Sequence, residues 1–418
     1  MDEIKETSKY FAEYLLGFLK WVLISALTGA VGGVIGSLFH ISVEKVTGFR
    51  NAHEWIIVFL PIAGLLIVLL YRAFGLEEKI GTNDILNAVR KKKKGVPTLL
   101  APAIFISTVL THMFGGSAGR EGAALQLGGS IASYVGKLFK VGEKDFPLVL
   151  MCGMAAVFSA LFATPLTAVF FAMEVISVGI MYYSALVPCL CASLIAYKIS
   201  LIFGAVPLFY KLNIPAVNLE ACFKIAVLAA LCAFLSIAFC VVMHTMARYL
   251  KMYIRNSYIR IAVGGAAVVL LTVICGTYDY NGAGMGVISD AMAGHARPEA
   301  FLLKIIFTAL TIGAGYRGGE IVPTFFIGSV FGCTVASLIG VDPGFGAAVG
   351  LVAMFCGVVN CPVASIFLAL ELFGAGGILF FAIACAVSYL MSGYHGLYSG
   401  QKIVYSKLRA EYIDIYAK

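Results

Sequence analysis

The chain has 418 residues, of which 61% are hydrophobic and only 12% are charged, and its mean hydropathy is +0.96. This composition leaves too little polar surface for a soluble globule, and it predicts an all-α polytopic membrane protein. The formal net charge of +8 does not indicate nucleic-acid binding, because the basic residues gather in short segments that flank apolar stretches.

Apolar stretches follow one another from about residue 14 to residue 392, and many contain glycine or proline. Several are too long or too short for one plain span of about 20 residues, so we expect broken and re-entrant helices. The pentabasic run at 90–94 lies in a short connection between two such stretches. The positive-inside rule predicts that this loop is cytoplasmic, and its charge also suits anionic lipid.

The first unusual segment is residues 115–124 (GGSAGREGAA), where an apolar stretch is broken by glycines around Arg120 and Glu121. A carboxylate at bilayer depth indicates a functional site, because charge there is costly. Glycines allow a helix to begin inside the membrane with free N–H groups, which favour an anion. The Glu121 carboxylate can occupy the anion position at this helix start. Because it would leave that position on protonation, it can link the movement of anions to the movement of protons. The alternative, a pair with Arg120, is weaker because neighbouring residues on a helix do not face each other.

The segment at 313–323 (GAGYRGGEIVP) repeats this pattern about 199 positions later. Residues 164–175 also align without gaps with residues 361–372, at an offset of 197. Ordered matches of this kind predict two structural halves, roughly 20–205 and 220–400. Glu174 and Glu371 fall at equivalent places in the second pair of segments. This duplication favours a structural task, such as binding backbone N–H groups, over the alternative of proton transfer.

Other reactive residue types show no site spacing. His112 lies near the first break, where a lone histidine is more often a packed or hydrogen-bonded residue. The eleven cysteines have no metal-ligand spacing and are interpreted as small buried hydrophobes. We therefore predict no metal site and no cofactor.

Four segments together resemble one family. Residues 119–123 (GREGA) resemble the GREGP signature of the CLC chloride channels and transporters, and residues 319–323 (GEIVP) resemble their GxFxP motif. Residues 81–83 (GTN) fall where that family has GSGIP, and residues 397–399 (Leu-Tyr-Ser) resemble its tyrosine segment. The matches keep the family order and cover nearly the whole chain. The resemblance implies a homodimer with one ion path per subunit and an inverted-repeat subunit of broken and tilted helices.

The resemblance also implies roles for single residues. Glu121 becomes the gating glutamate that couples protons, and Tyr398 supplies the central hydroxyl. The full set of anion-binding candidates is Thr82, Asn83, Gly119, Arg120, Gly122, Ile321, Val322 and Tyr398. The chain ends about 20 residues after Tyr398, so we expect no cytoplasmic CBS domains. That expectation fits a bacterial inner membrane, with the 90–94 loop and the C-terminus in the cytoplasm.

Departures from the sequence pattern of the chloride transporters indicate which anion this chain carries. The serine of GSGIP becomes Thr82, the isoleucine inside GxFxP becomes Glu320, and the inner glutamate of proton-coupled chloride exchangers becomes Val175. This combination is similar to the fluoride-exporting branch of the family, although that branch often has threonine at the place of Val322. An extra carboxylate at Glu320 repels an anion unless it is protonated or paired, so it suggests proton binding or organisation of the site. The alternative is a salt bridge to Arg317.

The sequence is compatible with three functions. The first is a fluoride/proton antiporter that exports fluoride, and the second is a chloride channel or chloride/proton exchanger of the same fold. The third is a membrane-embedded enzyme that uses Glu121 with His112. The third is the weakest, because no nucleophile, metal set or cofactor motif accompanies those residues. We therefore expect a transporter rather than an enzyme.

Overall fold

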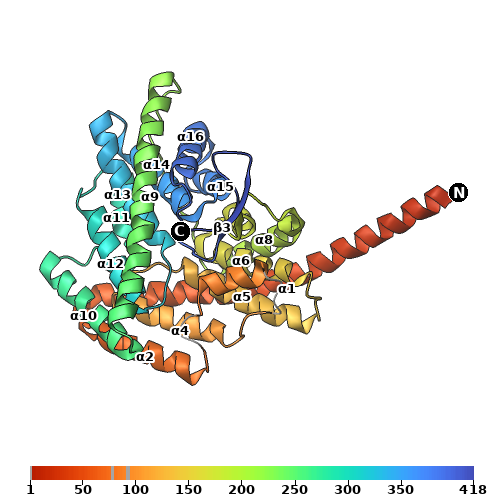
Figure 1. The fold of residues 1–418 in the computed structure, drawn as a ribbon, viewed down its shortest axis with the longest axis horizontal. Coiled ribbons are helices and arrows are strands. Elements are labelled where there is room, and N and C mark those ends of the chain that lie inside the picture. The colour runs from red at the N-terminus through yellow and green to blue at the C-terminus, as the bar shows by residue number, and fades with distance from the viewer. Residues whose placement is uncertain (1, 77–79, 91–94) are drawn as a thin grey trace.

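A computed structural model describes residues 2–76, 80–90 and 95–418, and most of this part of the chain is helical. This confirms the predicted all-α class. Figure 1 shows the helices in chain order, with the N-terminal end of α1 projecting from the body. The α-helices are α1 (Asp2–Ala52), α2 (Leu60–Ala73), α3 (Thr82–Arg90), α4 (Leu100–Met113), α5 (Glu121–Leu138), α6 (Phe146–Phe162), α7 (Pro165–Glu174), α8 (Leu186–Ile202), α9 (Leu219–Tyr253), α10 (Ser257–Cys275), α11 (Met285–Met292), α12 (Ala300–Ala314), α13 (Ile321–Ile339), α14 (Pro343–Val359), α15 (Pro362–Phe373) and α16 (Ile378–Met391).

The helices differ greatly in length, as the glycine and proline content predicts. Within the described residues, six helical segments are long and apolar enough to cross a membrane, and they are Tyr10–Ala52, Glu54–Ala73, Tyr183–Ile202, Leu219–Tyr253, Ser257–Cys275 and Ile321–Ile339. Shorter apolar helices such as α7, with 10 residues, reach only about 15 Å, half of a bilayer core of about 30 Å. The expected broken helices are therefore confirmed.

Two of the breaks have the same local geometry. Ala163 directly follows α6 and Asn360 directly follows α14, and both residues adopt the left-handed backbone conformation, with φ of 53° and 57°. The next helices, α7 and α15, then begin with Pro165 and Pro362, at the position where a missing N–H costs nothing. Each break therefore leaves the first N–H groups of a new helix unpaired inside the protein.

Two glutamates from opposite halves of the chain satisfy these N–H groups. The Glu371 carboxylate accepts from the Leu166 and Thr167 amides at 2.8 and 2.9 Å and from the Thr167 hydroxyl at 2.6 Å. The Glu174 carboxylate accepts from the Val363 and Ala364 amides at 3.3 and 3.0 Å. Each glutamate thus caps the helix that follows the other break, which confirms the structural task predicted for this pair.

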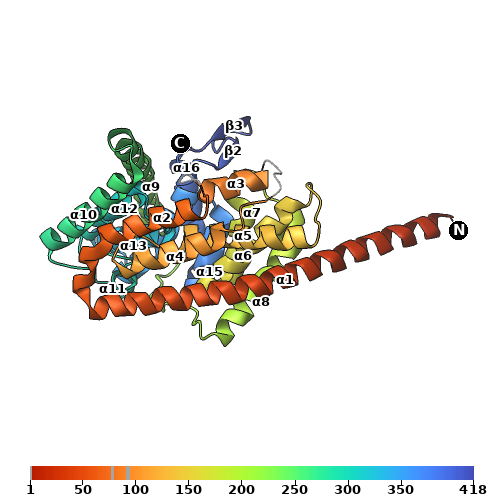
Figure 2. The same cartoon turned by 90° about the horizontal axis from the view of Figure 1, so that it is seen from below.

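A small sheet lies at one side of the helical body. β1 (Ser177–Val178) pairs in parallel with β2 (Lys402–Tyr405), which pairs antiparallel with β3 (Tyr412–Tyr416). Figure 2 shows β2 and β3 next to α3. Arg90 at the end of α3 donates to the Gly400 carbonyl at 2.7 Å and lies over the Tyr416 ring. The remainder of the basic run, 91–94, lies outside the described residues.

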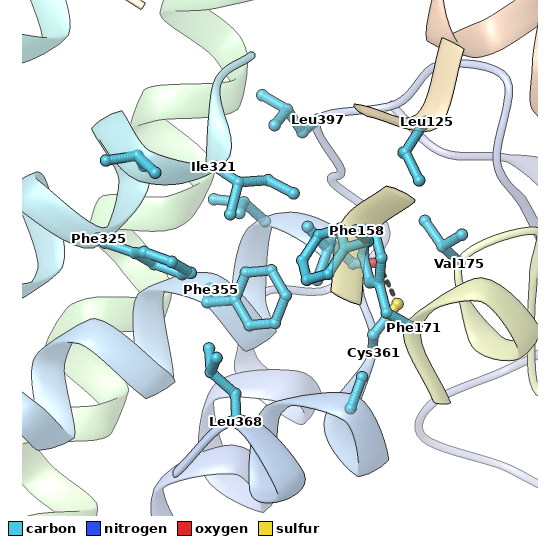
Figure 3. Close-up of a cluster of buried hydrophobic side chains, with 14 of the residues drawn as sticks. Leu125, Phe158, Phe171, Val175, Ile321, Phe325, Phe355, Cys361, Leu368 and Leu397 are labelled. Carbon is cyan, nitrogen blue, oxygen red and sulfur yellow. Dashed lines mark hydrogen bonds between the residues drawn. The ribbon is translucent and has the colours of Figure 1, made fainter. Parts of the chain in front are cut away.

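Apolar packing holds the ends of several helices together. Figure 3 shows Phe158, Phe171 and Phe355 in one cluster next to Ile321, the first residue of α13. The ring centroids of Phe158 and Phe171 are 5.1 Å apart, and those of Phe171 and Phe355 are 5.9 Å apart. Eight of the eleven cysteines are likewise buried, and all are free thiols, as expected for small hydrophobes.

Candidate functional site

The two glycine-rich breaks lie against each other in the interior. Gly119 donates its N–H to the Gly319 carbonyl at 2.6 Å, and Gly319 donates to the Gly119 carbonyl at 2.8 Å. α5 and α13 begin immediately after this pair, at Glu121 and Ile321. A side chain at position 319 would lie 2.5 Å from the Glu121 carboxylate, so this close approach requires glycine. The contact brings the two halves of the chain together at one point.

Glu121 is the first residue of α5, and its side chain is fully buried. The amides of Arg120, Glu121 and Val322 face the carboxylate. Within the described part of the chain, however, neither carboxylate oxygen has a partner at full hydrogen-bond geometry. The N-termini of α5 and α13 meet here, and each carries a partial positive charge of roughly half a unit. The carboxylate therefore occupies a position that favours an anion.

A cavity of about 280 Å³ lies beside the breaks. Among the predicted site residues, it is lined by Thr82, Asn83, Glu320 and Tyr398. Three basic side chains also line it, from Lys251, Arg260 and Arg317. The other predicted residues do not line it, and all of them except the half-buried Arg120 are buried: Gly119, Arg120, Glu121, Gly122, Ile321 and Val322. The structure thus separates a buried carboxylate from a neighbouring cavity that holds most of the polar groups.

Two of the predicted site residues that line this cavity, Tyr398 and Thr82, carry a hydroxyl group. Tyr398 is only 3% exposed, and within the described residues its hydroxyl has no hydrogen-bond partner. The Thr82 hydroxyl donates to the Gly122 carbonyl over a long 3.3 Å. Both hydroxyl groups can therefore bind a small anion. Tyr398 can do so without losing a hydrogen bond, whereas Thr82 must first break its weak bond to the Gly122 carbonyl.

Asn83 has a different environment from the one expected of an anion ligand. Its amide donates to the Ser399 hydroxyl at 3.1 Å, and its side-chain oxygen accepts from the Gly400 amide at 2.8 Å. Both polar atoms of the side chain thus hold the turn that follows Tyr398. The Gly119 N–H is likewise committed to Gly319. These two residues shape the site through other segments.

Glu320 is the residue before α13, and its main-chain carbonyl accepts from both the amide and the hydroxyl of Thr324. Its side chain lines the cavity, close enough to Glu121 for the two charges to interact. Arg317 donates to the Ile80 carbonyl at 3.0 Å and lies 4.1 Å from the centre of the Tyr71 ring. Among the ion pairs between described residues, none joins Arg317 to Glu320. The salt-bridge interpretation of Glu320 therefore finds no support.

Arg120 and His112 have contacts of their own. The Arg120 guanidinium lies over the Phe162 ring at 5.7 Å, and no ion pair between described residues joins it to Glu121. His112 is buried, and its Nε2 lies 3.2 Å from the Gly119 carbonyl. This is the hydrogen-bonded histidine expected from the sequence. Its contact with the Gly119 carbonyl helps to hold the backbone of the first glycine-rich break in place.

Sequence reasoning missed the polar residues that reach the cavity from other helices. Gln126 on α5 lines the cavity together with Lys251 on α9 and Arg260 on α10. One signal was available for Gln126, which is the only polar residue between Gly122 and Gly129. Lys251 and Arg260 fall in a basic segment, and nothing local distinguishes them from flanking charges.

Long apolar helices together with broken ones, two of which start at a shared buried carboxylate, define a multi-pass membrane protein. The family model described as voltage gated chloride channel matches residues 63–393. The chain therefore belongs to the voltage-gated chloride channel (CLC) family, as the sequence motifs predicted.

Similar proteins extend over almost the whole chain. The "Chloride/fluoride channel protein" of Pseudomonas syringae pv. tomato is 34% identical over 396 residues, which cover 93% of this chain and 87% of that protein. The H(+)/Cl(-) exchange transporter ClcA of Vibrio campbellii is 23% identical over 398 residues, which cover 84% of this chain and 81% of ClcA.

Solved structures share the fold. The crystal structure of a CLC-type fluoride/proton antiporter superposes with a TM-score of 0.89 at 34% identity, over 92% of this chain and 98% of that chain. A slow cyanobacterial Cl-/H+ antiporter superposes with a TM-score of 0.77 at 18% identity, over 89% and 94% of the two chains. The predicted CLC-type arrangement of broken and tilted helices is confirmed.

Proposed function

We propose that this protein exchanges fluoride for protons and exports fluoride by using the inward proton gradient. The observation that carries the proposal is the buried Glu121 carboxylate at the meeting point of α5 and α13. A carboxylate that holds an anion position when ionised, and leaves it when protonated, makes anion and proton movement depend on each other. The 34% identity to a fluoride/proton antiporter of known structure supports fluoride as the anion.

The anion would be held by hydroxyl and amide donors. In this proposal the Tyr398 and Thr82 hydroxyls meet it in the cavity, and the Ile321 and Val322 amides meet it at the start of α13. Fluoride is small and strongly hydrated, so a site must replace its water with compact, strong donors. Gly122 lies in the first turn of α5, at the helix end that carries a partial positive charge. Asn83, Gly119 and Arg120 set the shape of the anion site.

Glu320 has a separate task in this proposal. It lies at the cavity wall, near Glu121 but outside the buried gate position. An ionised carboxylate there opposes an anion, whereas a protonated one does not. We assign it to proton binding, or to the organisation of the site around a proton.

Chloride is the alternative substrate. The similarity to an H(+)/Cl(-) exchange transporter and to a protein named for both halides favours it. Val175, which stands where the inner glutamate of chloride exchangers falls, counts against proton-coupled chloride exchange of that pattern. A chloride channel or a chloride/proton exchanger of this fold remains the second candidate.

The proposal also covers the oligomeric state of the transporter, its membrane and its orientation. We place it as a homodimer in a bacterial inner membrane, with the 90–94 loop and the C-terminus in the cytoplasm. The basic loop supports this orientation through the positive-inside rule. The repeat boundaries are proposed at 20–205 and 220–400, and the activity is transport rather than catalysis.

Flux from liposomes tests the proposal. Purified protein is reconstituted with equal internal fluoride or chloride, and anion release is recorded with electrodes while pH is followed on both sides. Fluoride release that exceeds chloride release, with proton movement in the opposite direction, is the expected result. Chloride release without fluoride release would overturn the choice of fluoride, and anion release without proton movement would overturn the antiporter.

A further inference from the structure

Gln126 is a polar residue of the cavity to which the proposed function gives no task. It lies on α5, four positions after Gly122, and it is only 5% exposed. It lines the same cavity as Thr82, Glu320 and Tyr398. A buried amide in an otherwise apolar stretch is costly unless it has partners, so its contacts indicate what it does.

The Gln126 amide reaches the Thr82 hydroxyl. Its Nε2 donates to Thr82 Oγ1 at 3.4 Å, while Thr82 donates its single proton to the Gly122 carbonyl at 3.3 Å. A hydroxyl oxygen that accepts one hydrogen bond becomes a stronger donor in its own bond. The bond from Gln126 is itself long, and it orients the Thr82 proton away from Gln126. The long bond to Gly122 is a weak one that a stronger acceptor can replace.

The second polar atom of Gln126 has no partner. Its Oε1 is buried and accepts no hydrogen bond within the described part of the chain. Leaving a buried carbonyl oxygen without a donor is unfavourable, so a donor that enters the cavity would be held there. Water that stays on an anion fits this position, because it donates one proton to the anion and the other to Oε1.

We propose that Gln126 is a specificity-determining residue of the anion site. Its Nε2 polarises Thr82, so that the Thr82 proton turns from Gly122 to the anion. Its Oε1 accepts from a water molecule that the anion retains. Both effects favour a small, strongly hydrated anion over a larger one. The inference rests on the proposed function, since it takes fluoride as the anion that the site prefers.

The test compares the fluoride to chloride flux ratio in liposomes for Gln126→Met and for Leu125→Met, the preceding residue on the same helix. Leu125 points into the apolar cluster of Figure 3 and receives the same new side chain. Gln126→Met should lower the ratio about tenfold, which corresponds to roughly 1.4 kcal/mol. Leu125→Met should leave the ratio unchanged. Gln126→Asn, which keeps an amide but shortens its reach, replaces Gln126→Met if that variant does not fold, and the same fall is expected.

A double substitution separates this role from simple packing. Thr82→Val removes the hydroxyl that Gln126 polarises, so Gln126→Met in that background should change the ratio much less than in the wild type. Equal loss of both anions in Gln126→Met, or a full additional fall in the double variant, would overturn the inference. If wild-type protein carries fluoride with protons and the ratio of Gln126→Met is unchanged, only the inference fails. If wild-type protein carries no fluoride, the proposed function itself fails.

Discussion

The two glycine-rich breaks have similar sequences but present their glutamates differently. The Gly119–Gly319 pair sets their structural register, and in that register Glu121 corresponds to Ile321, while Glu320 corresponds to Arg120. Glu121 is thus inside the first turn of its helix, and Glu320 precedes its helix. A shift of one position separates a buried carboxylate from one at the cavity wall.

This difference shows how a duplicated fold produces an asymmetric site. The backbone geometry of the two helix starts is shared, and each supplies N–H groups to the same region. The side chain that enters the region from the first repeat is an acid, and the one from the second repeat is apolar. At the meeting point of the two helix starts, a single carboxylate, that of Glu121, can therefore compete with an anion.

The largest effect is expected from Glu121→Gln. The amide keeps the shape of the side chain but cannot exchange a proton, so proton coupling should be abolished while the protein stays folded. Proton movement driven by a fluoride gradient measures this, and the size-exclusion profile of the purified variant controls for folding. Persistent fluoride-driven proton movement would show that Glu121 is not the coupling residue.

Glu320→Ile makes the second break resemble the chloride pattern. If Glu320 carries protons or organises the site, fluoride flux should fall by about tenfold or more, since that is roughly 1.4 kcal/mol of barrier. An exposed ion pair would be worth only about 0 to 1 kcal/mol. Flux at several pH values checks the result, with Glu320→Gln as the variant that keeps the shape. Wild-type flux and coupling in Glu320→Ile would make Glu320 a bystander.

Tyr398→Phe removes one hydroxyl and little volume. A hydrogen bond to a charged group contributes about 1.5 to 3 kcal/mol, so anion flux or the fluoride to chloride preference should change by about tenfold to a hundredfold. Tyr394→Phe is the matched control, because the Tyr394 hydroxyl lies 2.8 Å from Ser406 and does not line the cavity. If Tyr398→Phe behaves like wild type in the flux assay, Tyr398 lies outside the ion path.

The smallest effect on transport is expected at the capping glutamates. Glu371→Gln and Glu174→Gln each replace a carboxylate that caps a buried helix start with an uncharged amide. Both should therefore lower the free energy of unfolding by about 1 to 3 kcal/mol. Glu371 accepts three hydrogen bonds and Glu174 accepts two, so Glu371→Gln should cost more. Thermal unfolding in detergent measures the difference. A change in anion preference without loss of stability would contradict a purely structural role.

Local patterns predicted much of this molecule. Glycine breaks around isolated charges located both helix starts, and the spacing of Glu174 and Glu371 indicated their shared task. The contacts of Asn83 were not predictable, because its partner Ser399 lies 316 positions away and no local pattern records which segments meet. Gln126 was missed for the same reason, since its importance comes from Thr82 on another helix.

Uphill proton transport is the clearest sign that fluoride and protons are exchanged by the same protein. Liposomes that contain the wild-type protein are given a fluoride gradient at equal pH on both sides, and internal pH is recorded as fluoride leaves. We expect protons to accumulate inside as fluoride flows out, and we expect Glu121→Gln to abolish this accumulation. Fluoride efflux with no change in internal pH, or proton accumulation that survives in Glu121→Gln, would contradict it.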